Sequence, residues 1–298
     1  MKNKFLLQDH PYNIVSRSPW PLTVALGIFF LALNGLLYLQ TFKFALFGLI
    51  ISFLVIFYSI LRWTTDVIYE NKYLGEHTTY VEINYLLGFI LFLLSEILFF
   101  ISFFWASFNY SFNPTIWIGC VWPPEEISKD IISHKSKPSF MNVLLLLSSF
   151  TITCAHQFYS ACLTYLSVVY WFITILLGII FFMFQISEYR ESYLSFSSSV
   201  FGSVFFILTG FHGLHVLLGL IWLSFSFFEL HAFYIYGTYL DLPPFFRLTT
   251  LTGSQFKGPL FSIYYWHFVD TIWLFVFYLV YVSISLENIN FLWLIGTY

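Results

Sequence analysis

One carboxylate near the middle of a long apolar stretch, Gly88–Ala106, is the first residue in this sequence that could do chemistry. It is Glu96, and Phe92, Phe99 and Phe100 surround it at helical spacing. The stretch is long enough to cross a bilayer as a helix, which needs about 20 apolar residues. A charge at that depth costs at least ~2.5 kcal/mol on insertion scales. Two interpretations stay open: a proton-handling or reactive carboxyl, and a protonated or hydrogen-bonded glutamate that holds helices together.

A pair of histidines in the apolar segment Gly210–His215 (GFHGLH) is the second candidate. His212, His215 and Gly219 fall at positions i, i+3 and i+7, so they share one face of a helix. Gly213 and Gly219 would let another helix backbone approach closely. The histidines could ligate a metal or haem, or form hydrogen bonds to the carboxylate described above or to other helices. No ExxH or HExxH pattern accompanies them, which favours the hydrogen-bonding interpretation.

A histidine and an aspartate three residues apart form the third candidate, in the segment Tyr265–Asp270 (YWHFVD). At this spacing His267 and Asp270 can serve as each other's partner on a helix. A mutually neutralised pair is the least costly way to carry charge into a bilayer. The pattern therefore predicts a structural pair.

Charged and aromatic residues also gather where apolar segments end. Arg62, Trp63 and His77 would lie at headgroup depth, where they suit either lipid phosphate binding or an ordinary interfacial belt. Ala155–Gln157 places a histidine and an amide within the fourth apolar segment, and Glu188–Glu191 indicates an interfacial charge cluster.

The composition identifies the environment of these residues. Of 298 residues, 59% are hydrophobic, 24% aromatic and only 9% charged, and the mean hydropathy is +0.81. Soluble domains have about 25% charged residues, so this is a polytopic membrane protein. The net charge of −3 and the lack of a basic patch give no sign of a nucleic-acid partner. Cys120, Cys154 and Cys162 lack CxxC spacing and are expected to be small buried hydrophobic residues.

Seven continuously apolar runs predict membrane-spanning helices and an all-α fold, because barrel strands would alternate instead. With no linker that would separate soluble domains, residues 1–298 are expected to form one transmembrane domain. The predicted spans are about Pro21–Gln40, Phe44–Leu61, Tyr85–Phe108, Met141–Cys162, Leu166–Ser187, Val200–Phe228 and Phe261–Leu286.

The residues outside these apolar runs bear on targeting, on orientation in the membrane and on catalytic motifs. The residues before Ser18 lack the apolar core of a signal peptide. Basic residues favour the N-terminus on the side of insertion, although Lys129, Lys135 and Lys137 would lie on the other side. No Walker loop, GxGxxG or GxSxG motif is present, so nothing indicates a catalyst that acts alone.

The motifs then point to a family. In order and spacing, over essentially the whole chain, they closely resemble cytochrome c oxidase subunit III. The matching motifs are SPWP (Ser18–Pro21), GxHT (Gly75–Thr78), SExxFFxxFFWA (Ser95–Ala106), WPP (Trp122–Pro124), SEY (Ser187–Tyr189), TGFHGLHV (Thr209–Val216) and YWHFVDxxWL (Tyr265–Leu274).

The resemblance implies seven helices, with the first two (about residues 21–61) splayed from a bundle of five (about residues 85–286) around a lipid-filled cleft. It implies a core subunit without catalytic residues or metal ligands, since haem and copper lie in subunits I and II. Such a subunit packs against subunit I, binds structural phospholipids and sustains proton uptake in the mitochondrial inner membrane, with its N-terminus on the matrix side. Glu96 matches the carbodiimide-reactive carboxyl of the family. His212, His215, His267 and Asp270 become its polar network.

This sequence also departs from the family pattern. Thr65 and Glu229 replace basic residues that usually contact phosphate, and Asn109 and Leu260 replace a histidine and a glutamate. The segment 229–260 is longer than usual and is expected to contact accessory subunits. The residues expected to bind lipid instead are Trp63, Arg62, His77, His231 and Arg247.

Two alternatives remain at this stage. One is the matching subunit of a bacterial quinol oxidase, which would differ by a partner subunit II without dinuclear copper. The other is a stand-alone transporter or receptor, which would be isolated without haem.

Overall fold

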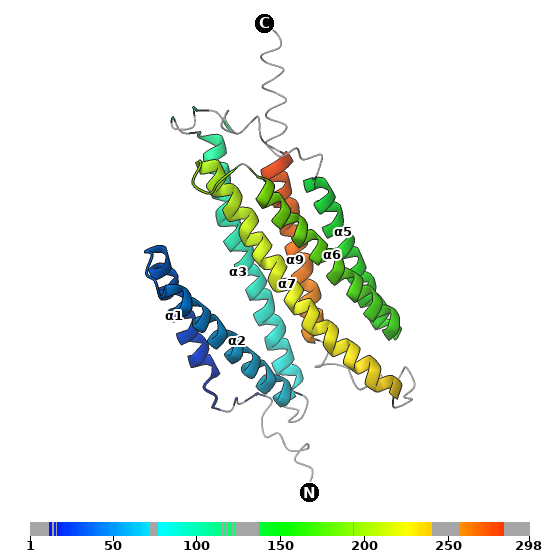
Figure 1. The fold of residues 1–298 in the computed structure, drawn as a ribbon. Helices are drawn as coiled ribbons and strands as arrows, with labels where there is room; N and C mark the ends of the chain where they lie inside the picture. Colours follow the sequence, from blue (N-terminus) through cyan, green and yellow to red (C-terminus); the bar gives the residue numbers. More distant parts are fainter. Residues whose placement is uncertain are drawn as a thin grey trace. The chain divides into compact units, whose positions relative to one another are not determined.

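The computed structural model describes residues 12–13, 15, 17–71, 77–114, 116, 119–120, 122, 137–192, 194–239 and 257–282. In this part of the chain, seven helices are long and apolar enough to span a membrane, which confirms the predicted all-α, seven-span class. The helices are α1 (Trp20–Leu39), α2 (Ala45–Tyr69), α3 (Thr79–Phe112), α5 (Lys137–Ser160), α6 (Thr164–Glu191), α7 (Val200–Tyr239) and α9 (Lys257–Phe277), with the π-helical turn η5 (Tyr278–Val282) after α9 (Figure 1).

Several helices extend beyond their predicted ends, and the largest extensions are at the C-terminal ends of α2 and α7. Helix α2 continues from Leu61 to Tyr69, and α7 continues from Phe228 to Tyr239. Hydropathy identifies only the part of a helix that is apolar enough to lie in lipid. The helix itself can continue beyond that part into the polar surroundings. Part of the expected loop 229–260 is therefore helical, and residues 240–256 lie outside the described part.

The chain divides into two compact units, Met1–Gly88 and Phe89–Tyr298, and α3 crosses the boundary between them. In the first unit, α1 and α2 form a hairpin that depends on two glycines. A Cβ atom at Gly27 would lie 2.6 Å from Ile56 Cγ1, and one at Gly48 would lie 2.1 Å from Asn34 Oδ1. The two helices are thus closer than larger residues would allow.

One end of the hairpin is fixed by a tryptophan. Trp20, in the first turn of α1, donates from Nε1 to Asp66 Oδ2 of α2 at 2.5 Å. Arg62 lies over the Trp20 ring, 5.7 Å from its centroid, in a cation–π contact. Pro21 occupies the first helical turn, where a missing N–H loses no helix bond.

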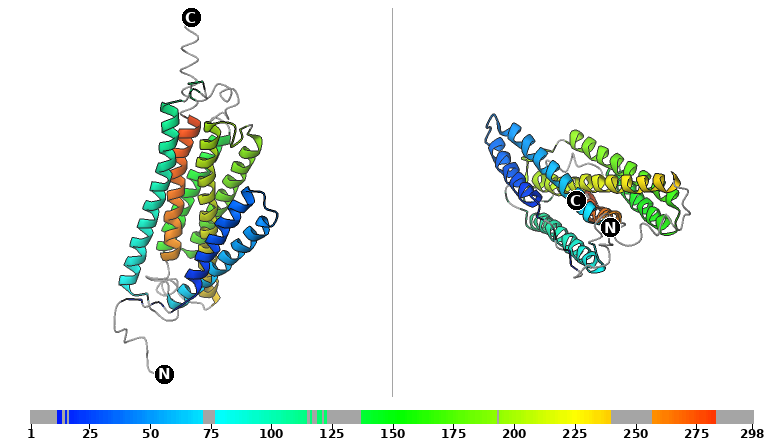
Figure 2. Two further views of the ribbon diagram at one scale, coloured as in Figure 1. Left: turned by 90° about the vertical axis from the view of Figure 1, so that its left-hand side faces the viewer. Right: turned by 90° about the horizontal axis from the view of Figure 1, so that it is seen from below.

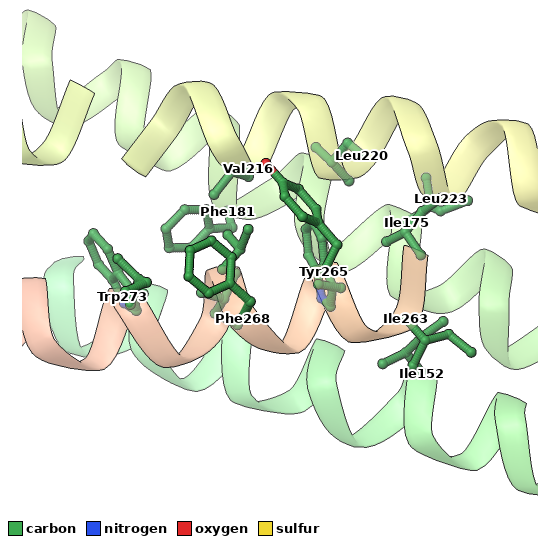
Figure 3. Packing of buried hydrophobic residues seen from close by; sticks show 14 of the residues in the cluster. Ile152, Ile175, Phe181, Val216, Leu220, Leu223, Ile263, Tyr265, Phe268 and Trp273 are labelled. Carbon is green, nitrogen blue, oxygen red and sulfur yellow. The ribbon is translucent and has the colours of Figure 1, made fainter. Parts of the chain in front are cut away.

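In the second unit, α5, α6, α7 and α9 run side by side (Figure 1, Figure 2). Their contact faces carry large apolar side chains, and Figure 3 shows Phe181, Tyr265 and Trp273 filling the space between α6, α7 and α9. The largest fully buried side chains are Trp171, Trp266, Trp273, Tyr281, Phe100, Phe181, Met141, Leu145, Ile152, Leu208, Leu223 and Ile263.

Glycines on α6 and α7 make room for one of these rings. A Cβ atom at Gly178 would lie 2.6 Å from Leu220 and 2.8 Å from the Trp266 ring, and one at Gly219 would lie 3.0 Å from the same ring. At Gly219 the neighbouring atoms are the side-chain rings of Trp266 and Tyr265, whereas the sequence predicted a helix backbone there. At Gly213 the added atom would meet nothing within 4 Å among the described residues.

Two helices end in the same tight turn. After α1, Thr41 N–H donates to Tyr38 O and Phe42 N–H to Leu37 O, and after α5 Cys162 and its neighbour repeat this pattern. Thr41 and Cys162 have φ angles of 63° and 65°, values that favour glycine.

All three cysteines are free; Cys154 and Cys162 are half-buried, while the prediction of burial is wrong for Cys120, which is exposed.

Candidate functional site

The carboxylate of Glu96 on α3 meets an imidazole on α7. His215 Nε2 lies 2.8 Å from Glu96 Oε2, and the two side chains are 8% and 23% exposed respectively. Of the histidine roles left open by the sequence, the structure therefore shows a bond to Glu96 for His215. This pair joins α3 to α7 near the middle of two helices that are long and apolar enough to span a membrane.

The other ring nitrogen of His215 determines where a proton lies. Its Nδ1 is 2.7 Å from the carbonyl oxygen of Phe211. A carbonyl only accepts, so Nδ1 carries a proton and donates it. One further proton then lies between Nε2 and Glu96 in either of two states: imidazolium with carboxylate, or neutral imidazole with carboxylic acid. The pair can move that proton between its two atoms without breaking the contact.

Aromatic rings surround this pair. The His215 ring centroid is 5.0 Å from that of Phe100, which is fully buried. Tyr265 and Phe268 of α9 lie 6.5 Å from the same ring. Such apolar walls lower the local dielectric and strengthen the bond between carboxyl and imidazole relative to water.

His212, one turn before His215, has a separate partner. It is fully buried, and its Nε2 lies 3.3 Å from the carbonyl oxygen of Val269 on α9. Its ring is tilted against that of Trp273, with centroids 4.9 Å apart. His212 and His215 thus bond to different helices, α9 and α3.

His267 and Asp270 each bond to α5 instead of to each other. His267 Nε2 is 3.3 Å from Thr153 Oγ1, and Asp270 Oδ2 accepts a hydrogen bond of 2.8 Å from Ser149. The two side chains still interact electrostatically with each other, while hydroxyls at positions i and i+4 of α5 supply their hydrogen bonds. The two residues therefore belong to the seam between α5 and α9.

The residues expected to bind lipid lie at several places. In the first unit Arg62 and Trp63 are exposed on α2, and His77 is half-buried with its ring 5.2 Å from that of Tyr85. In the second unit His231 on α7 stacks on Phe227 at 5.6 Å. Arg247, like Gly75 and Glu76 of the GxHT motif, lies outside the described residues.

The charge cluster predicted at Glu188–Glu191 is divided between interior and surface. Glu191 forms an exposed ion pair with Lys137. Glu188 is 2% exposed and accepts a 2.7 Å hydrogen bond from the hydroxyl of Tyr281. Sequence analysis missed Glu188 as an interior residue. The available signal was its spacing, since Phe181, Gln185 and Glu188 follow i, i+4 and i+7 on one face of α6.

No group of three or more His, Cys, Asp or Glu side chains that could hold a metal occurs in the part of the chain that the structure describes. Long apolar helices joined at depth by a carboxyl–imidazole pair define a polytopic helical membrane protein whose ionisable groups bond between helices. The sequence matches the family model of cytochrome c oxidase subunit III over residues 10–285.

Relatives carry the same description. Proteins named cytochrome c oxidase subunit 3 from Chondrus crispus, Rhipicephalus sanguineus and Arabidopsis thaliana are 38%, 37% and 35% identical to this chain. The alignments cover 92%, 91% and 92% of this chain and 94%, 98% and 97% of those proteins. The chain therefore belongs to the cytochrome c oxidase subunit III family. It is a multi-pass membrane subunit that works in a complex with other oxidase subunits.

Proposed function

We propose that this chain is a non-redox subunit of its oxidase, bound to subunits I and II in the mitochondrial inner membrane with its N-terminus on the matrix side. The complex would oxidise cytochrome c, reduce dioxygen to water and pump protons, with haem and copper held by the partner subunits. The name shared by the relatives favours cytochrome c over a quinol as the donor. Family membership removes the stand-alone transporter or receptor.

The observation that carries the proposal is the Glu96–His215 pair. It holds a transferable proton at membrane depth, between helices, with one side chain almost fully buried. A group of this kind is expensive in a bilayer and is expected to serve proton handling. Its proposed role is to sustain proton uptake by the complex through repeated turnovers, with His212, His267 and Asp270 fixing the helices around it.

The test is the replacement Glu96→Gln in the assembled oxidase. Glutamine keeps the size and a hydrogen bond to His215 but cannot exchange a proton. We expect a near-normal initial rate and an active lifetime during continuous turnover that is shortened severalfold. Glu82→Gln, the same change near the start of α3, should leave the lifetime unchanged. An unaltered lifetime in Glu96→Gln would leave this carboxyl with a packing role only.

Phospholipid binding is the second part of the proposal. The hairpin α1–α2 exposes apolar side chains along its length, and Arg62, Trp63 and His77 stand near its polar end. A guanidinium at headgroup depth attracts lipid phosphate. Native mass spectrometry of the complex should show retained phospholipid, and Arg62→Gln should reduce it more than Arg190→Gln on α6. Complete delipidation without loss of assembly or turnover would contradict this role.

The segment 229–260 is proposed to contact accessory subunits. Its first part, to Tyr239, continues α7 as helix. A structure of the complex in which this extension lies free in solvent would remove the proposal.

A further inference from the structure

Among the described residues of the second unit, three tryptophans are fully buried, and their indole N–H groups differ in their hydrogen bonds. Trp171 Nε1 donates to the carbonyl of Leu223, and Trp266 Nε1 donates to Ser148 Oγ, both at 3.0 Å. Trp273 is equally buried, but its Nε1 has no hydrogen-bond partner among the described residues. An indole N–H that is buried normally finds a partner, so Trp273 requires an explanation.

Side chains near Trp273 also carry buried polar atoms that lack a hydrogen-bond partner. Both amide atoms of Gln185 are buried and make no hydrogen bond of good geometry within the described part of the chain, although the amide interacts with the nearby hydroxyl of Tyr189. Glu188 Oε2 and His212 Nδ1 are also buried and lack a partner there. Exposed fractions are 3% for Gln185, 2% for Glu188 and 0% for His212. Such atoms are rare in native interiors, and here several occur together.

These groups form one column between α6, α7 and α9. At one level the Trp273 ring lies 4.9 Å from the His212 ring and 5.0 Å from the Phe181 ring. At the other level Tyr281, whose ring is 6.3 Å from that of Trp273, donates to Glu188. Gln185 lies one turn after Phe181 and one turn before Glu188, and therefore between the two levels.

We propose that this column, formed by Gln185, Glu188, His212, Trp273 and Tyr281, binds ordered water molecules that bridge its unpaired atoms. An unpaired buried polar group costs about 1–3 kcal/mol. Bound water typically makes about three hydrogen bonds to groups of this kind. The inference stands on the packing of this unit and does not depend on the proposed role of Glu96.

The chemistry of the column selects water over an ion. Its groups include the N–H donor of Trp273, the amide of Gln185, which both donates and accepts, and the acceptor His212 Nδ1. The Nδ1 atom accepts because the other ring nitrogen faces a carbonyl. A cation would meet the indole N–H, and an anion would meet Glu188. Water can donate to the acceptors and accept from the donors in one site.

The column also ends near the surface. Glu191 lies one turn after Glu188 on α6, is 61% exposed, and pairs with Lys137, which is 37% exposed. The Glu188 end of the column is thus the end closer to exposed polar residues, whereas His212 lies near the middle of α7.

A cryo-EM map of the assembled oxidase, at a resolution that shows water, tests the inference directly. We expect density within hydrogen-bonding distance of Trp273 Nε1 and Glu188 Oε2. No such density should accompany Trp171 Nε1, because a carbonyl already satisfies it. Direct contacts among the column side chains, with no density between them, would overturn the proposal.

A substitution provides a second test through the size of its effect. If water fills the column, Gln185→Leu removes it and leaves Trp273 and Glu188 unpaired, so the thermal midpoint of the subunit should fall by at least about 2 °C. Leucine also removes the interaction with the Tyr189 hydroxyl, so the fall should exceed that caused by Tyr189→Phe; a fall no larger than that, or a rise, would overturn the proposal. Gln157→Leu, at an exposed amide on α5, is the matched control and should change little.

Discussion

The α1–α2 hairpin and the bundle formed by α5, α6, α7 and α9 are both built from apolar helices, and α6 and α7 are about as apolar as α1 and α2, but the two regions bury very different shares of their residues. In the most apolar windows of α1 and α2, 6% and 17% of residues are buried, against 50% in α5, α7 and α9. Hydropathy therefore does not distinguish a helix that meets lipid or a partner from one that has its own core. The apolar side chains of the hairpin therefore need lipid or a partner chain to pack against, whereas those of the bundle pack against one another.

The hairpin and the bundle also differ in where their hydrogen-bonding side chains lie. In the hairpin the bond between Trp20 and Asp66 lies near the ends of the helices. In the bundle, hydroxyls bond between helices at depth, as in the 2.8 Å contact of Thr151 with Thr174. Such contacts add specificity where lipid gives no hydrophobic driving force between helices. Substitutions in the bundle should therefore cost more than similar ones in the hairpin.

The largest effect is expected from Gly178→Val. Its Cβ would lie 2.6 Å from Leu220 and 2.8 Å from Trp266, both inside the core. Overpacking costs about 1–3 kcal/mol or more, and here it should reach the upper end because a buried indole cannot move aside. The measurement is the fraction of purified oxidase that retains this subunit, which should fall sharply. Gly35→Val, where the new atom meets nothing within 4 Å among the described residues, should retain it.

Trp171→Phe should come next. It removes the 3.0 Å hydrogen bond to the carbonyl of Leu223, which keeps its bond within the helix, and it leaves empty space in a fully buried place because the phenyl ring is smaller than the indole. We expect a loss of about 1–3 kcal/mol, seen as a lower thermal midpoint of the subunit. Trp20→Phe, at the end of the hairpin, is the matched change and should cost less. An equal cost at both sites would contradict the distinction between the two regions.

Gly27→Val should have a smaller effect than Gly178→Val, although the geometric conflict is similar. Its Cβ would lie 2.6 Å from Ile56 Cγ1, but Ile56 is only half-buried and can rotate toward lipid. A cost near 1 kcal/mol is expected, about the lower limit for overpacking, without loss of the subunit from the purified complex. Loss as complete as for Gly178→Val would show that the hairpin is as tightly constrained as the bundle.

The smallest effect, and the only gain, is expected from Thr41→Gly. Thr41 ends α1 at φ 63°, where a β-branched residue is strained. Glycine should raise stability by up to about 1 kcal/mol in a thermal melt. Thr64→Gly, inside α2, should lower it by about the same amount. A destabilised Thr41→Gly variant would contradict this account of the turn.

Features that depend on composition and on depth in the bilayer could be predicted from the sequence. Seven spans followed from apolar runs, and a partner for Glu96 followed from the cost of a lone carboxylate in a bilayer. The choice of His215 over His212 could not be predicted, because both lie on one face and only the positions of α3 and α9 separate them. Glu188 was expected at the interface because it neighbours Arg190 and Glu191, yet its helix face turns it toward Tyr281.

The central claim is that Glu96 and His215 act as one proton-sharing unit. A double-mutant cycle with Glu96→Gln and His215→Gln, measured as the active lifetime of the oxidase during continuous turnover, tests it most directly. The account predicts that each single variant shortens the lifetime and that the double variant is no worse than the more affected single one. Fully additive effects, or lifetimes equal to that of the unaltered oxidase, would contradict it.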